Sequence, residues 1–123
     1  MNLRLDHVQV AGPPGCEPEA REFYGNILGL RELVRPKELD GIGGCWFECG
    51  ALQLHIGTQP DFTPARKAHP AFRVDELDAL RTTLRSAGYP VIEDTMIPGT
   101  DRFFSADPWG NRLEFILEAG GKV

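Results

Sequence analysis

The sequence lacks two features that mark common classes of protein. No apolar run approaches the roughly 18 residues of a membrane-spanning helix. Lys and Arg do not cluster, and 13 basic residues against 18 acidic ones give a net charge of −5, so the basic patch of a nucleic-acid-binding protein is missing. We therefore expect a protein that binds neither membrane nor nucleic acid.

Cysteine is also scarce. The chain has three cysteines, an odd number that excludes a fully paired disulfide framework and is typical of a reducing compartment. Cys45 and Cys49 lie four residues apart in a predicted strand, about 13 Å, which is too far to bind one ion. The opening Met-Asn-Leu-Arg-Leu-Asp-His has no basic region followed by an apolar stretch, so it does not resemble a signal peptide. We expect a cytoplasmic protein.

The length and composition are those of one globular domain. The chain has 123 residues, of which 41% are hydrophobic and 25% charged, enough to bury about two thirds of the unfolded surface in one core. We expect a single domain over residues 1–123.

Within that domain the order of elements occurs twice. The first half predicts a strand, a helix ended by Gly29, and three strands, at residues 3–10, 17–28, 31–35, 44–49 and 51–57. The second half predicts the same order: a strand at 69–74, a helix between Asp75 as N-cap and Gly88 as its end, and strands at 91–95, 102–106 and 112–117. The expected organisation is module one at about 3–57, a linker at 58–68 and module two at about 69–118.

Potential metal ligands lie at matching places in the two halves. His7 and His69 are 62 residues apart, and His55 and Glu114 are 59 apart. Imidazole and carboxylate groups bind Zn, Ni, Mn and Fe(II) in catalytic sites. The repeat therefore predicts one divalent metal ion with two ligands from each module.

The predicted strands place these residues on particular faces. Alternation puts Gln53 and His55 on one face of their strand, with Leu54 on the other. Glu114 lies in the apolar run Leu-Glu-Phe-Ile-Leu, where a carboxylate is costly to bury unless it is paired or bound to a metal. Glu114 is thus the most informative acid of the chain.

Four segments together resemble the vicinal oxygen chelate superfamily, which includes glyoxalase I, fosfomycin-resistance proteins, bleomycin-resistance proteins and extradiol dioxygenases. They span nearly the whole chain and are Leu5-Asp6-His7-Val8, Phe23-Tyr24-Gly25-Asn26-Ile27-Leu28-Gly29-Leu30, His69-Pro70-Ala71-Phe72-Arg73-Val74 and Asp107-Pro108-Trp109-Gly110-Asn111-Arg112-Leu113-Glu114-Phe115. The resemblance implies an α+β fold of two βαβββ modules that form an open, curled mixed sheet around a cavity, usually in a homodimer.

The resemblance also implies which residues hold the metal. The metal-dependent members take ligands from the first and last strand of each module, and those positions here hold His7, His55, His69 and Glu114. Their shared chemistry is chelation of a small substrate through vicinal oxygens, so that the cation stabilises developing negative charge.

His55 is where the sequence departs from glyoxalase I, which has a carboxylate ligand and base there. A histidine can bind metal and transfer protons, so His55 is a fourth ligand or a catalytic acid/base, with Glu114 the other candidate catalytic residue. Methylglyoxal is therefore a poor candidate substrate. The expected substrate-binding residues are Trp46, Gln53, Arg102 and Phe104.

Two classes of function remain open. The first is a metal-dependent enzyme, namely a lyase, isomerase, dioxygenase or thiol-transfer catalyst. The second is a non-catalytic protein that binds a small molecule or antibiotic, as bleomycin-resistance proteins do, with Glu114 paired to a neighbouring histidine in place of a metal. The sequence alone gives neither the substrate nor the identity of the metal.

Overall fold

The computed structural model describes residues 1–118, and the chain divides into two compact units at Pro64 and Ala65. This boundary lies inside the expected linker at 58–68. Cys16 and Cys45 are buried, Cys49 is half-buried, and no disulfide joins them.

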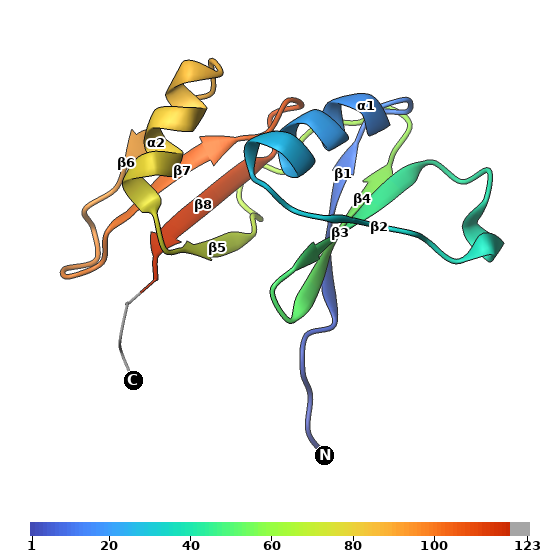
Figure 1. Cartoon of the computed structure of the whole chain (residues 1–123), viewed down its shortest axis with the longest axis horizontal. Coiled ribbons are helices and arrows are strands. Elements are labelled where there is room, and N and C mark those ends of the chain that lie inside the picture. Colours follow the sequence, from blue (N-terminus) through green and yellow to red (C-terminus); the bar gives the residue numbers. More distant parts are fainter. Residues whose placement is uncertain (119–123) are drawn as a thin grey trace. The chain divides into compact units, whose positions relative to one another are not determined.

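The first unit contains a four-stranded sheet with the order β1-β4-β3-β2 (Figure 1). β1 runs parallel to β4, whereas β4 and β3, and β3 and β2, are antiparallel. Its elements are β1 (His7–Gly12), α1 (Glu17–Ala20), the π-helical segment η1 (Arg21–Ile27), β2 (Glu32–Leu33), the short 3-10 helix η2 (Lys37–Leu39), β3 (Gly44–Cys49) and β4 (Leu52–Thr58).

The second unit repeats this topology with the order β5-β8-β7-β6. Its outer pair β5 and β8 is parallel, and the remaining pairs are antiparallel. The elements are β5 (Ala71–Val74), α2 (Leu77–Ser86), β6 (Ile92–Glu93), β7 (Arg102–Ala106) and β8 (Arg112–Leu117). Two modules with mixed, unclosed sheets confirm the expected α+β fold class.

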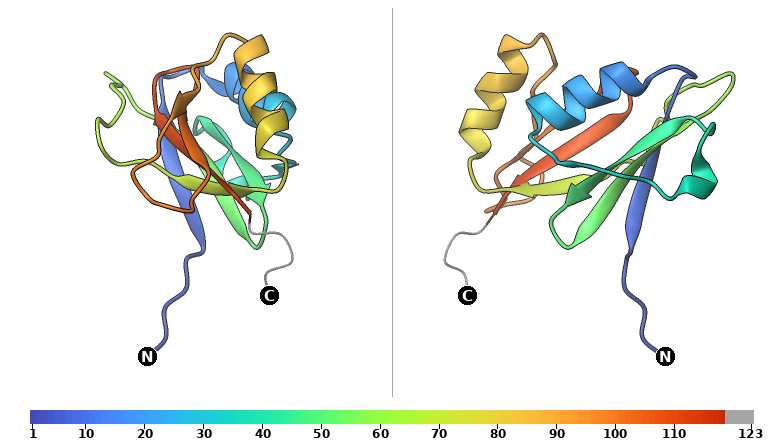
Figure 2. Two further views of the ribbon diagram at one scale, coloured as in Figure 1. Left: turned by 90° about the vertical axis from the view of Figure 1, so that its left-hand side faces the viewer. Right: turned by 45° about the vertical axis from the view of Figure 1, so that its right-hand side comes forward.

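In each unit a helix covers one face of the sheet. Phe47 on β3 is fully buried and its ring centroid lies 6.1 Å from that of Tyr24 on η1. In the second unit the buried Leu77 and Leu84 lie on α2, which packs along the sheet (Figure 2). Because strand side chains alternate, the opposite face of each sheet carries the candidate site.

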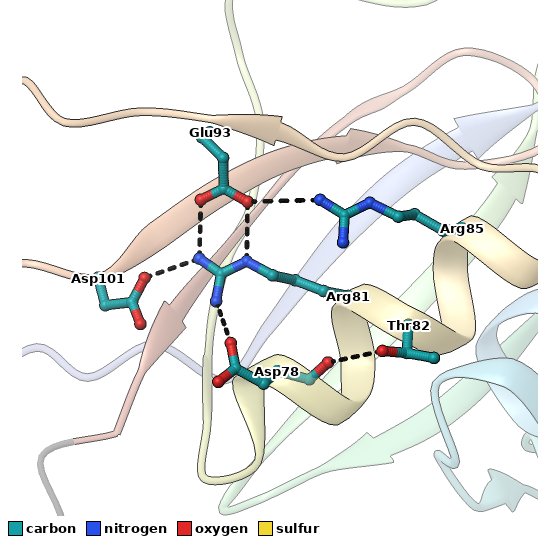
Figure 3. A network of polar contacts seen from close by, with 6 residues as sticks. All are labelled: Asp78, Arg81, Thr82, Arg85, Glu93 and Asp101. Carbon is teal, nitrogen blue, oxygen red and sulfur yellow. Dashed lines mark hydrogen bonds and ion pairs between the residues drawn. The ribbon is translucent and has the colours of Figure 1, made fainter.

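A cluster of ion pairs joins α2 to β6 and to the residue before β7 (Figure 3). The guanidinium of Arg81 donates to Glu93 through Nε and Nη2, both at 2.8 Å, and to Asp101 at 2.7 Å and Asp78 at 2.6 Å. The Arg81 side chain is only 11% exposed, and these hydrogen bonds, first of all that to Glu93, raise its pKa. Arg81 therefore links α2 to β6 and to the residue that precedes β7.

Several expected strand boundaries, one expected helix type and one expected helix cap were wrong. The first strand begins at His7, four residues later than expected, because residues 3–6 lack a continuous partner strand. The helix over 17–28 is helical but changes from α to π after Ala20. Glu76, and not Asp75, is the N-cap of α2, and no side chain caps it. The remaining strands are shifted or shortened by a few residues, except 44–49, 102–106 and 112–117, which match.

The turn between β7 and β8 forms as expected. The Oδ1 atom of Asp107 accepts the backbone N–H of Trp109 at 3.0 Å and of Asn111 at 2.9 Å. The Asn111 side chain donates to Asp107 Oδ2 at 2.8 Å. These hydrogen bonds of the buried Asp107 and Asn111 fix the start of β8 and hence the position of Glu114 along it.

Over residues 1–118 no helix is both long and apolar enough to cross a bilayer.

Candidate functional site

His7 begins β1 with its ring fixed by the residue before it. His7 Nδ1 lies 2.9 Å from Asp6 Oδ2. A carboxylate at this distance favours the proton on Nδ1, which leaves the Nε2 lone pair free. Many histidine metal ligands likewise donate their other ring N–H to a carboxylate, which fixes the tautomer and the ring orientation.

His55 on β4 lies between two other rings. It pairs directly with Trp46 on β3, and the two rings stack with centroids 3.9 Å apart and planes 3° apart. The His7 ring covers His55 as well, with a centroid distance of 4.1 Å and an interplanar angle of 16°. His55 is 4% exposed. β1, β3 and β4 thus bring His7, Trp46 and His55 to one face of the first sheet.

The stacked conformation bears on whether His55 can bind the same metal ion as His7. Two imidazoles that bind one cation each direct a ring nitrogen at it, so both ring planes contain the metal and cannot lie face to face. In the stacked conformation His7 and His55 therefore do not serve the same ion. His55 has to turn out of the stack to become a ligand, whereas an acid/base role needs no such rotation.

Burial and the neighbouring His7 lower the pKa of His55. Its Nε2 lies 2.8 Å from Gln53 Oε1, a contact in which the ring nitrogen donates. At neutral pH the ring is thus uncharged, with Nδ1 as its basic nitrogen. Gln53, expected to bind substrate, here sets the tautomer of His55.

A pocket of about 590 Å³ opens over this face of the first unit. Ligand pockets of small-molecule-binding proteins have volumes of roughly 300–1,000 Å³. His7, Trp46, Gln53 and His55 all line it. Among the expected substrate-binding residues, Trp46 and Gln53 are therefore in a pocket of suitable size for a small molecule.

Two charged residues also line this pocket and were not predicted from the sequence as site residues. Asp6 also lines it, and its sequence position directly before His7 was the signal. Arg35 lines it from the loop after β2 and donates to the carbonyl oxygen of Ile42. Nothing in the local sequence points to Arg35, because its role depends on how the 36–43 loop folds back.

In the second unit His69 and Glu114 meet directly. His69 Nε2 lies 2.8 Å from Glu114 Oε1, and His69 Nδ1 donates to the carbonyl oxygen of Lys67 at 2.9 Å. Two cis ligands with bonds of about 2.1 Å have donor atoms about 3.0 Å apart, so this pair suits a shared metal ion. The same contact without a metal is a buried histidine–carboxylate ion pair.

Glu114 has a second partner in Arg102 on β7. Arg102 Nη1 donates to Glu114 Oε2 at 2.8 Å, and Arg102 Nη2 donates to Asp94 at 3.0 Å. Burial alone would raise the pKa of Glu114, but the hydrogen bonds from His69 and Arg102 outweigh it, so that its pKa lies below the ordinary value. Glu114 is therefore an ionised carboxylate and a weak base.

Phe104 lies directly opposite Glu114, as Trp46 lies opposite His55 in the first unit. Its ring meets the edge of His69 with centroids 5.6 Å apart and lies under the guanidinium groups of Arg102 and Arg112, at 5.3 and 4.2 Å. The two sheets thus present equivalent faces. Neither unit, over its described residues, gathers three or more His, Cys, Asp or Glu side chains into a metal-binding group.

The duplicated βαβββ topology and the His and Glu residues on the open faces define a protein of the vicinal oxygen chelate type. Residues 4–115 match the family model described as Glyoxalase/Bleomycin resistance protein/Dioxygenase superfamily. The chain belongs to this superfamily. A comparison with curated proteins finds no match.

Solved structures agree with this assignment. A Bacillus anthracis protein described as belonging to the glyoxalase family is 47% identical, with a TM-score of 0.90 over 96% of this chain and 97% of that one. The fosfomycin resistance protein FosX from Listeria monocytogenes (16% identity, TM-score 0.78, 98% and 97% covered) shares the fold. So does a lactoylglutathione lyase from Agrobacterium tumefaciens (18% identity, TM-score 0.72, 97% of each chain).

Proposed function

We propose that this protein is a metal-dependent enzyme that acts on a small oxygenated molecule. The observation that carries the proposal is the 2.8 Å contact between His69 Nε2 and Glu114 Oε1 on a buried carboxylate. His7, His69 and Glu114 are the proposed ligands of one divalent ion, which is Zn, Ni, Mn or Fe(II). The bound cation would supply a Lewis acid for chelated vicinal oxygens.

The remaining residues have roles that follow from their surroundings. His55 is proposed as the catalytic acid/base, since it is neutral, basic at Nδ1 and already lines the pocket. Trp46 and Gln53 hold it in place and line the space for the substrate. For His55 to be a fourth metal ligand instead, its ring has to rotate out of the stack with Trp46 and His7.

The reaction belongs to the range found in this superfamily, namely a lyase, isomerase, dioxygenase or thiol-transfer reaction. Among the proteins that share the fold, one is a lactoylglutathione lyase and another a fosfomycin resistance protein. A histidine at position 55 disfavours a reaction that needs a carboxylate ligand to leave the metal and take up a proton. We further propose a cytoplasmic homodimer with no nucleic-acid or membrane partner.

Competition with a metal-binding dye tests the proposed ligands. The parent protein is titrated with Zn²⁺ beside His7→Ala, His69→Ala and Glu114→Ala, with Glu48→Ala as a control on an exposed β3 carboxylate that pairs with Arg31. Each ligand variant is expected to lose at least a hundredfold in affinity, about 2.7 kcal/mol, while the control matches the parent. Equal Zn²⁺ affinity in all variants would contradict the proposal.

One observation favours a second candidate function. His69 and Arg102 already satisfy both oxygens of Glu114 without a metal, as in a non-catalytic small-molecule or antibiotic-binding protein of the bleomycin-resistance type. Such a protein would bind its ligand equally well with and without chelator, and His7→Ala would leave the affinity unchanged. A hundredfold loss of ligand affinity on adding chelator would exclude it.

A further inference from the structure

Arg112 on β8 is a half-buried arginine whose guanidinium has no hydrogen-bond acceptor among residues 1–118, and no carboxylate of that range forms an ion pair with it. The side chain instead contacts the ring of Phe104, whose centroid lies 4.2 Å from the guanidinium carbon. Two other arginines of the described chain, Arg4 and Arg66, also lack a partner, but both are exposed. Water therefore solvates those two charges more fully than it solvates Arg112.

The contact with Phe104 orients the guanidinium of Arg112 without using its donors. The negative face of an aromatic ring attracts a cation placed over it, which favours one position of an otherwise flexible side chain. The ring covers one face of the planar guanidinium, whereas the five N–H groups lie in its plane and point outwards. Two parallel N–H groups on one edge match two oxygens of a carboxylate or a phosphate. Arg112 thus presents oriented donors that no group in residues 1–118 occupies.

This guanidinium belongs to the face that carries His69 and Glu114. Arg112 and Glu114 are two residues apart on β8, so their side chains lie on the same side of the sheet. Phe104 pairs with Glu114 across β7 and β8, and its ring meets the edge of the His69 ring with centroids 5.6 Å apart. An anion bound by Arg112 would therefore lie on the same face as the proposed metal ligands.

Arg102, the other arginine that packs on Phe104, differs in that its terminal nitrogens are engaged. They donate to Glu114 Oε2 at 2.8 Å and to Asp94 Oδ1 at 3.0 Å. The backbone N–H of Met96, then Arg102 and lastly Arg112 lower the pKa of Asp94, so Arg112 attracts Asp94 without forming an ion pair with it. Of the two arginines on Phe104, Arg112 is the one whose terminal nitrogens are open to a ligand.

We propose that Arg112 binds an oxyanionic group, a carboxylate or a phosphate, of the small molecule that binds at this face. That this molecule is a substrate rests on the proposed function, whereas the anion binding itself needs no metal and would equally serve a binding protein. A guanidinium stays charged at any physiological pH, so Arg112 favours an anion over a neutral molecule of the same shape. The expected ligand is thereby narrowed from a small oxygenated molecule to a small oxygenated acid.

Binding of two simple anions to the metal-free protein tests this inference. Sodium phosphate and sodium acetate are titrated into the whole chain at pH 7, at constant ionic strength because salt screens exposed charges. ¹⁵N NMR follows the Nε–H signal of Arg112, which is identified by its absence from Arg112→Gln. Acetamide, which has the shape of acetate but no charge, is the control ligand. At least one of the two anions is expected to shift the Arg112 signal, and acetamide is expected to leave it in place.

Three variants compare the loss of this cation with the loss of another. Arg112→Gln removes the charge, Arg112→Lys keeps the charge without the planar fork, and Arg85→Gln removes an exposed charge from α2 that only approaches Glu93 at 4.0 Å. Backbone amide signals of β7 and β8 report the affinity in each variant, and circular dichroism establishes that each is folded. Arg112→Gln is expected to lose about tenfold in anion affinity, which is about 1.4 kcal/mol. Arg85→Gln should match the parent, and Arg112→Lys should lie between the two.

The outcomes separate this inference from the proposed function. A parent that binds neither anion, or binds acetamide as well as acetate, overturns the role of Arg112 and leaves the metal proposal standing. Equal losses in Arg112→Gln and Arg85→Gln also overturn it, because they would reflect net charge alone. Anion binding that depends on Arg112 in a protein that binds no Zn²⁺ supports the inference and overturns the metal-dependent function. Tighter binding of acetate supports a carboxylic acid as the ligand, and tighter binding of phosphate supports a phosphate or phosphonate.

Discussion

Trp46 and His55 stack face to face across the β3–β4 pair, with planes only 3° apart. The equivalent register positions in the second unit hold Phe104 and Glu114. The duplicated module thus places an aromatic residue opposite a polar group on the open face of each sheet. In the first unit the rings of Trp46 and His7 cover His55, which is only 4% exposed although it lies on the face away from the helix.

The stack predicts the titration of His55. Burial and His7 lower its pKa from an ordinary value of 6.5, so NMR of the three histidines should show His55 titrating below that value. His7→Ala uncovers the ring and removes the neighbouring charge, so we expect the pKa of His55 to rise towards 6.5.

The sign of the linked stability follows from the lowered pKa. The pKa of His55 is lower in the folded than in the unfolded protein. Protonation of His55 therefore destabilises the fold progressively as pH falls below 6.5 and has no effect well above it. His55→Gln should remove that part of the pH dependence. A His55 signal that titrates at 6.5 or higher in the parent would contradict the buried, neutral ring.

Glu17 is expected to stabilise the folded protein while its carboxylate is ionised. Its Oε2 accepts the backbone N–H of Gly44 at 2.6 Å, and this bond is the main cause that lowers the pKa of Glu17 below 4.5. The contribution is fully present above pH 4.5 and is lost as pH falls through the lowered pKa. Glu17→Gln should cost about 1 kcal/mol of unfolding free energy at pH 7.

Urea unfolding at pH 7 and at pH 3 measures this contribution, with the exposed Glu38→Gln as control. The deficit of Glu17→Gln relative to the parent should shrink at pH 3, because Glu17 is then increasingly protonated in both folded and unfolded protein. An equal deficit at both pH values would show that the stabilising effect of the hydrogen bond between Glu17 and Gly44 does not depend on the charge of Glu17.

Much of the fold could be predicted from the sequence because it carries two independent signals, the alternation of side chains along the strands and the repeat of the module. Alternation gave β3, β7 and β8 their correct bounds, and the repeat gave the order of elements and the positions of the candidate ligands. Strands β2 and β6 were overestimated, since pairing limits them to two residues each. Alternation cannot show where a partner strand ends.

The sequence predicted which faces of the strands carry the candidate site, but not which of its side chains contact one another. The sequence indicated that His55 and Gln53 share a face and that Glu114 is buried, and both are confirmed. The contact of Arg102 with Glu114 depends on the β7–β8 register, and that with Asp94 on the 94–101 loop. Neither contact could be predicted from residue spacing.

Glu114→Gln should destabilise the metal-free protein. The change removes the negative charge that Arg102 and His69 share, and leaves Arg102 with Asp94 as its carboxylate partner. We expect a loss of about 1–3 kcal/mol in urea unfolding at pH 7. Glu118→Gln, which alters an exposed carboxylate just after β8, should have little effect, and an equal loss in both variants would contradict the account.

Arg81→Met should loosen α2 (Figure 3). Three carboxylates, those of Asp78, Glu93 and Asp101, would then repel one another without their shared cation, at a cost of about 1–3 kcal/mol. Hydrogen exchange should quicken in α2 and around β6 while the first unit is unaffected. Arg85→Met is the control, because Arg85 only approaches Glu93 at 4.0 Å.

The most direct test of the central claim is the number of Zn²⁺ ions bound per chain. One ion per chain in the parent, and none in either His69→Ala or Glu114→Ala, is the expected result, because these two residues, 2.8 Å apart, are proposed to bind the same ion. Retention of a full ion in both variants, or two ions per parent chain, would contradict a single centre.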